Sequence, residues 1–228
     1  MKVLLLCDDY WHPGDVPIDG VKPLEAAGFE FDVITDATDF DTDVLKKYPV
    51  ILLCKSGEIS ATNKDSWKTA EVQKAFVDYI ESGGGLVAVH NATVPGENTG
   101  VMDKLIGSKF VFHPNNCPVT VQPIKPHPVT AGVGMFCEMD EHYRLEILSD
   151  DVDIIMASYS PAQGEESKYQ DEPYHNTTAW IDAAGYVRTQ GKGRICVLTP
   201  GHLPCVWQNP NFLRALNNAL KWCAGENV

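Results

Sequence analysis

The sequence has 228 residues, of which 44% are hydrophobic, so it can form one globular domain with a large buried core. Thirty-one acidic residues against eighteen basic ones leave a formal charge of −13, which repels phosphate backbones and anionic lipids. We therefore expect neither nucleic acid nor a membrane as partner, and a neutral or cationic small molecule as ligand.

The N-terminal residues begin like a signal peptide, but their apolar run ends at Asp8 and Asp9, too early for the apolar region of such a leader. No stretch of about 18 apolar residues is present that would span a bilayer. Seven cysteines occur without a C-x-x-C pair, and several lie in apolar runs, which indicates reduced thiols in the core. A cytoplasmic location is expected.

The first half of the chain alternates strands with helices. Short apolar runs bounded by polar residues predict strands at 2–7, 29–34, 50–54 and 86–89. Helices are predicted at 18–27 and 66–81, the second ended by the glycine run at 83–85. This alternation is typical of βαβ units and predicts a doubly wound α/β fold, with a mostly parallel sheet flanked by helices.

The second half is less regular. It contains a predicted helix at 101–106, strands at 119–123, 141–148, 154–158 and 194–199, a polar surface loop at 159–176, a hairpin of 177–181 with 185–187, and a closing helix at 211–222. No repeat or composition break divides the chain, so residues 1–228 are predicted to form a single domain.

Three histidines follow predicted strands. His12 comes after the first strand, His90 with Asn91 after 86–89, and His202 after 194–199. Ligands of open parallel sheets bind outside the carboxyl ends of the strands, so these side chains are expected at one functional edge. His113 lies in the excursion after His90 and can fold back over the same edge.

His90 stands where α/β hydrolases place a nucleophile on a sharp turn. No serine or cysteine occupies this turn, and histidine suits a general base or a metal ligand better than a nucleophile. The structural alternative is a half-buried histidine bonded to a carbonyl. For His202 a plain surface-loop role is equally compatible with its position, and Glu141 lies in an acidic segment of a kind that is usually solvated.

Two histidines and a glutamate can hold zinc or a similar divalent ion with an open position for water. The metal candidates are His90, His113 and His202. No H-x-x-x-H, H-E-x-x-H or C-x-x-C spacing supports a metal locally. The glycine run at 83–85 lacks the nucleotide-binding patterns, which argues against a dinucleotide or nucleoside triphosphate.

An ordered set of short motifs covers nearly the whole chain: GGLVAVH at 84–90, FHP at 112–114, HPVTAGV at 127–133, DEHY at 140–143 and GH at 201–202, with Trp207, Phe212 and Trp222. In this set the chain resembles the ThuA-like (trehalose-utilisation) family, which is similar in fold to class I glutamine amidotransferases. The resemblance implies that His90 takes the place of the amidotransferase elbow cysteine and that His202 matches its downstream histidine. Cysteine-dependent glutaminase activity, from Cys54 or Cys205, is therefore not expected.

The family is linked to sugar utilisation, and the resemblance implies an enzyme that processes a sugar or keto-sugar derivative. His90 would be base or ligand, His202 its partner and Glu141 an orienting carboxylate. A divalent metal, zinc or similar, that bridges the histidines would assist elimination, isomerisation or hydrolysis. The residues expected to contact substrate are His12, Asn91, His113, Tyr143 and Trp207.

The alternative is a non-catalytic sugar-binding or regulatory module. Such a module would show aromatic platforms, with Trp11, Tyr143 and Trp207 as candidates, without convergent titratable groups. His142 stands where the family usually has an apolar residue, which leaves open whether it packs or points into the site. A homo-oligomer is compatible with the sequence.

Overall fold

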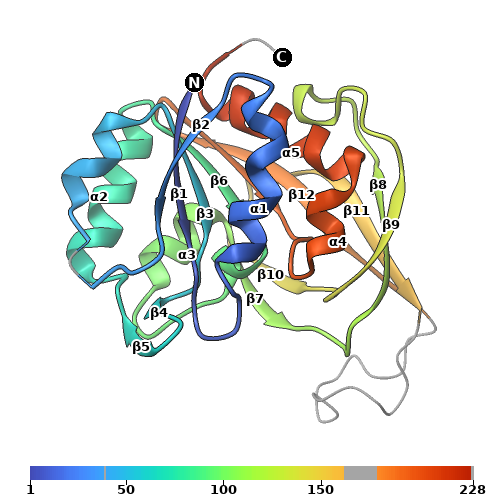
Figure 1. Cartoon of the computed structure of the whole chain (residues 1–228), viewed down its shortest axis with the longest axis horizontal. Coiled ribbons are helices and arrows are strands. Elements are labelled where there is room, and N and C mark those ends of the chain that lie inside the picture. Colours follow the sequence, from blue (N-terminus) through green and yellow to red (C-terminus); the bar gives the residue numbers. More distant parts are fainter. Residues whose placement is uncertain (39, 162–178, 227–228) are drawn as a thin grey trace.

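The computed structural model describes residues 1–38, 40–161 and 179–226. Its centre is a nine-stranded sheet in the order β2-β1-β3-β6-β13-β12-β11-β8-β9 (Figure 1). These strands are β1 (Lys2–Cys7), β2 (Glu30–Ile34), β3 (Val50–Cys54), β6 (Gly85–Val89), β8 (Cys117–Pro123), β9 (Phe136–Asp140), β11 (Asp153–Pro161), β12 (Ala179–Gln190) and β13 (Gly193–Leu198). Two small sheets pair β4 (Glu58–Ser60) with β5 (Asn63–Ser66), and β7 (Ser108–Phe112) with β10 (Arg144–Ile147).

The sheet has a parallel half and an antiparallel half. Strands β2, β1, β3, β6 and β13 run parallel, and every residue of β3 and β6 is buried, as expected for strands covered on both faces. Strands β12, β11, β8 and β9 extend this core with antiparallel pairs. The α/β class is thus confirmed.

Helices cover both faces of the sheet (Figure 1). Side chains alternate along a strand, so Leu5 of β1 packs into the core beneath α1 (Asp15–Glu25), α4 (Pro204–Gln208) and α5 (Pro210–Cys223). Its neighbours Leu4 and Leu6 face α2 (Ala70–Glu81) and α3 (Gly100–Ile106) instead. Two cores therefore hold the parallel strands rigidly from both sides.

Four predicted elements differ from the structure. Helix α2 begins at Ala70 because Thr69 caps it through its hydroxyl and residues 63–66 pair with β4. Helix α1 begins at Asp15, earlier than predicted. The strand predicted at 141–148 is β10 alone, since residues 141–143 form the junction between β9 and β10. The predicted hairpin of 177–181 with 185–187 is wrong over its described residues: β12 is one strand, paired with β11 on one side and β13 on the other, and residues 177–178 lie outside the described residues.

Of the predicted loop at 159–176, residues 159–161 belong to β11, and the remainder lies outside the described residues. All seven cysteines are free thiols, as the sequence predicts. Within the described parts of the chain, no helix is long and apolar enough to cross a membrane.

Candidate active site

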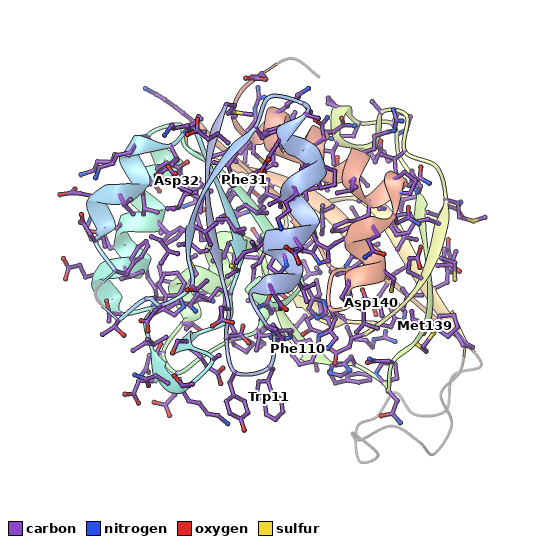
Figure 2. The ribbon with its side chains drawn as sticks, viewed as in Figure 1. Trp11, Phe31, Asp32, Phe110, Met139 and Asp140 are labelled. Atoms are coloured by element: carbon purple, nitrogen blue, oxygen red, sulfur yellow. The ribbon has the colours of Figure 1, made fainter. Side chains whose placement is uncertain are left out.

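The three strand-following histidines meet at the carboxyl edge of the parallel strands. His12, His90 and His202 follow β1, β6 and β13, and Glu141 reaches the same place from the junction between β9 and β10. The ligand atoms of these four residues all lie within 4.8 Å of one another. Figure 2 shows this edge at the lower side of the molecule, where Trp11, Phe110 and Asp140 are labelled. Their positions after predicted strands lead us to expect these three histidines at one edge of the sheet.

His90 occupies a strained turn that aims its ring into the cluster. Its backbone φ is 48°, and the Thr93 hydroxyl donates to its carbonyl at 2.8 Å. The Nδ1 atom lies 2.8 Å from the carbonyl oxygen of Thr199, which can only accept, so Nδ1 carries the proton. The Nε2 lone pair therefore points into the site. Burial lowers the pKa of His90 to about 4, so the ring is neutral near pH 7.

Glu141 faces that lone pair as a carboxylate. Burial alone would raise its pKa, but the charges of His113 and His202 act in the opposite direction and hold the pKa of Glu141 below its usual range. Its Oε2 lies 3.4 Å from His90 Nε2 and 3.4 Å from His202 Nδ1. Among the described residues, His90 Nε2 has no well-formed hydrogen bond. Two electron-rich atoms held this close fit a shared cation.

Asp9 orients His12 from behind. Its Oδ1 lies 2.7 Å from His12 Nδ1, which fixes the proton on Nδ1 and turns Nε2 toward the cluster. Its Oδ2 accepts from the amide of Asn91 at 2.7 Å and the backbone N–H of Ser56 at 2.9 Å. Burial opposes ionisation of Asp9, but these hydrogen bonds and His12 hold its pKa well below the usual range.

Asp9 was not among the predicted site residues, although its place directly after a buried strand is the signal that could have found it. Asn91, predicted to bind substrate, is buried and also donates to the carbonyl of Cys54 at 3.0 Å. One side-chain N–H of Asn91 thus holds Asp9 and the other holds the carboxyl end of β3.

The loop carrying His202 is fixed at Gly201. A Cβ at Gly201 would lie 2.9 Å from Val89 Cγ1, and its φ of +145° is strained for other residues, so only glycine allows this approach to the neighbouring strand. Asp140 accepts the backbone N–H groups of Gly201 at 2.8 Å and His202 at 3.0 Å. Trp207 donates its indole N–H to the Gly201 carbonyl at 2.8 Å and is 2% exposed, so it supports the loop from inside.

Tyr143 and His113 complete the cluster. The Tyr143 ring stacks on His90 with ring centroids 3.8 Å apart, and its hydroxyl lies 3.2 Å from His12 Nε2. His113 Nδ1 lies 2.7 Å from the carbonyl of Pro114, and its Nε2 is 3.2 Å from Glu141 Oε1. His113 therefore contacts the carboxylate oxygen opposite to that shared by His90 and His202. The close set of potential ligands contains His12 and Glu141 in place of the predicted His113.

The remaining polar candidates lie elsewhere. His142 packs inside the protein and does not point into the site. Its ring nitrogens lie 2.9 Å from the hydroxyl of Ser158 and 2.6 Å from that of Ser160. His127 caps a turn through Val129 N–H. Burial raises the thiol pKa of Cys54 and of Cys205, which disfavours the reactive thiolate that a glutaminase needs. His175 lies outside the described residues.

A family model described as ThuA, trehalose utilisation, matches residues 2–223. The chain belongs to the ThuA family. A comparison with curated proteins finds no match.

Solved structures share the fold. A ThuA-like protein from Parabacteroides merdae is 19% identical with a TM-score of 0.75, covering 100% of this chain and 91% of its own. One from Bacteroides uniformis is 20% identical with a TM-score of 0.70, covering 100% and 92%. A carbohydrate deacetylase, Agd3, is 14% identical with a TM-score of 0.61 and covers 97% of this chain but 32% of its own. At these identities the likeness concerns the fold.

Proposed function

We propose that this ThuA-family protein is an enzyme that processes a sugar or keto-sugar derivative by acid–base chemistry of histidines and Glu141, assisted by a divalent metal ion. The observation that carries the proposal is the convergence of ligand atoms from His12, His90, Glu141 and His202 within 4.8 Å. Three imidazoles and a carboxylate form a donor set that zinc and similar ions prefer.

The second layer of the site supports a metal. Histidine ligands of metals usually donate their other ring N–H to a carboxylate or a carbonyl, which fixes the tautomer. His12 does so to Asp9 and His90 to the Thr199 carbonyl. Because the pKa of His90 is about 4, its Nε2 carries no proton at neutral pH. The space between Nε2 and the Glu141 carboxylate is therefore open to a metal ion. A bound metal would act as a Lewis acid on a substrate oxygen or on water.

The protein's own groups suit proton transfer next to a polarised carbonyl. His202 lies on the most exposed side of the cluster, with a side chain 21% exposed against 1% for His90. It is the better placed of the two to meet substrate, either as the acid or base that exchanges protons with it or as a metal ligand that holds the ion within its reach, but not as both at once. Elimination, isomerisation and hydrolysis each need such a base or acid.

The sugar substrate rests on the family and on charge. The family is described by trehalose utilisation, and one structure of the same fold is a carbohydrate deacetylase. The charge of −13 favours a neutral small molecule over nucleic acid, phosphate or anionic lipid. Two proteins of similar fold from Salmonella typhimurium are described as cytoplasmic, which suits a cytoplasmic enzyme of small-molecule metabolism.

A purely binding module is less well supported. It calls for aromatic platforms without converging titratable groups, yet Tyr143 and Trp207 are each 2% exposed and four titratable side chains converge. Trp11 alone of the three candidate platforms is accessible.

The test is the metal content of protein purified without chelator or polyhistidine tag, measured by mass spectrometry. We expect stoichiometric zinc, manganese or nickel in the wild type and its loss in His90→Ala and His202→Ala. His127→Ala is the matched control, because it removes a part-buried histidine that only caps a turn. A metal-free wild type, or equal metal in all variants, would overturn the metal-assisted mechanism.

A further inference from the structure

A pocket of about 330 Å³ adjoins the cluster and shares His12 with it. Trp11 lies at the pocket, and the segments after β3, at β5 and after β6 form its other walls. This volume is at the lower end of the range for small-molecule sites. No group of the cluster other than His12 lines it, so it is a separate space beside the proposed reaction centre.

Trp11 presents a fixed aromatic face at this pocket. Its side chain is 66% exposed, and Figure 2 shows it projecting from the lower edge of the molecule. Its backbone N–H donates to Asp9 Oδ1 at 3.0 Å, and Tyr10 N–H donates to Glu58 at 2.9 Å. Tyr10 packs edge-on against Trp11 with ring centroids 4.8 Å apart. The carboxylate that orients His12 therefore also fixes the backbone that carries Trp11.

Hydroxyl and carboxylate groups face the aromatic side. Ser66 lines the pocket, and its Oγ, which is buried and has no hydrogen-bond partner within the described parts of the chain, would have to rotate to reach a ligand. Glu58, Asp65 and Glu97 add acceptors. Sugar rings offer an apolar C–H face and hydroxyls that both donate and accept, and so match this arrangement.

The charge of the pocket selects against phosphorylated sugars. Glu58, Asp65 and Glu97 stand against one lysine, Lys64, whose ammonium lies 3.3 Å from the Tyr10 ring centroid. A phosphate here would meet three carboxylates with little compensation.

We propose that this pocket is a second sugar subsite, in which an uncharged ring stacks on Trp11 while the unit that reacts lies at the histidine cluster, with His12 between them. The inference rests on the proposed function and sharpens it. The substrate is then a neutral glycoside of at least two sugar units, and Trp11 recognises the unit that does not react.

The test is calorimetric binding of four neutral disaccharides, trehalose, maltose, cellobiose and lactose, with trehalose 6-phosphate as the charged counterpart. We expect at least one neutral sugar to bind. Trp11→Ala should weaken it by about 2- to 10-fold, the range expected for loss of one aromatic contact. Trp11→Phe should retain most of the affinity. Met135→Ala, which alters an equally exposed apolar side chain away from the pocket, should change nothing.

Trehalose 6-phosphate should bind more weakly than the neutral sugars, and Glu97→Gln should narrow the difference. His90→Ala should keep the Trp11-dependent affinity even if it loses metal, so this test and that of the metal site can fail separately. Absence of binding by all four neutral sugars, equal binding by Trp11→Ala, or preference for the phosphorylated sugar would each overturn the subsite.

Discussion

The parallel and antiparallel halves of the sheet contribute different chemistry to the site. The parallel half supplies His12, His90 and His202, each in the segment that follows a buried strand. The antiparallel half supplies the counter-charge, since Glu141 lies between β9 and β10. The neutral His90, whose Nε2 has a free lone pair, thus belongs to the parallel half. The carboxylate that faces it belongs to the antiparallel half.

The difference shows how a site can be divided between rigid and adaptable parts of one fold. The carboxyl ends of parallel strands lie at the same edge of the sheet, whatever the sequence of their loops. Side chains that follow these ends therefore lie close together. Glu141 converges only because β9 extends the sheet and the chain then turns back over the edge toward β7. Changes on the two sides should therefore have separable effects.

The largest effect is expected from the antiparallel side. Glu141→Gln removes the one carboxylate of the cluster and leaves its histidines without a counter-charge. Zinc affinity should fall more than about 100-fold, beyond the loss typical of second-layer changes. Competition with a chromophoric chelator measures it, and Glu138→Gln in the same segment is the control, since Glu138 only accepts from Asn209. Unchanged zinc affinity in Glu141→Gln would remove Glu141 from the ligand set.

The sequence predicted the parallel side well and the antiparallel side poorly, for physical reasons. Apolar runs such as 50–54 mark a buried strand and its end, so the histidines after such runs could be placed on one edge. Glu141 stands in an acidic segment that has no such pattern, and only the family resemblance singled it out. In β12, the predicted hairpin left residues 182–184 as a turn and began its second strand at Gly185, whereas the chain continues through them as one strand. Gly185 lies inside the strand, where a Cβ would collide with the Met156 side chain.

The next largest effect is expected at Asp9, which supports His12 on the parallel side. Asp9→Asn keeps the size of the side chain but replaces the carboxylate that fixes the His12 tautomer and accepts from Ser56 N–H. Zinc affinity should fall about 10–100-fold, as is typical of second-layer partners. Asp8→Asn is the matched control, because Asp8 Oδ1 accepts from Gly14 and contacts no histidine of the site. If both variants bind zinc like the wild type, Asp9 has only a structural role.

A backbone change tests how closely the parallel strands must approach. Gly201→Ala places a Cβ 2.9 Å from Val89 at a φ of +145°. Thermal unfolding should show a loss of about 2 kcal/mol, the usual cost of overpacking a core. Gly28→Ala has a positive φ of +89° but no neighbour within 4 Å, so it reports backbone strain alone. Equal losses in the two variants would mean that the contact with Val89 does not hold the loop in place.

The last effect, which is small at neutral pH, separates two buried histidines, one on each side. Burial lowers the pKa of both His90 and His142 to about 4, but His90 faces Glu141, whereas His142 lies between the hydroxyls of Ser158 and Ser160. Unfolding exposes both rings, whose pKa then returns to about 6.5. Between these values the unfolded state binds more protons, so stability falls as the pH falls from about 6.5 to 4.

His142→Gln keeps a polar side chain between the serines but removes one titration. In metal-free protein, the free energy of unfolding should depend on pH less steeply than in the wild type, by up to about 1.4 kcal/mol per pH unit in that interval. Urea denaturation at a series of pH values measures the slope. Zinc affinity at neutral pH should stay unchanged, because His142 faces away from the cluster. Parallel slopes in variant and wild type would show that His142 gains a proton in the folded state as readily as in the unfolded chain. Water would then reach the ring of His142 more readily than that of His90.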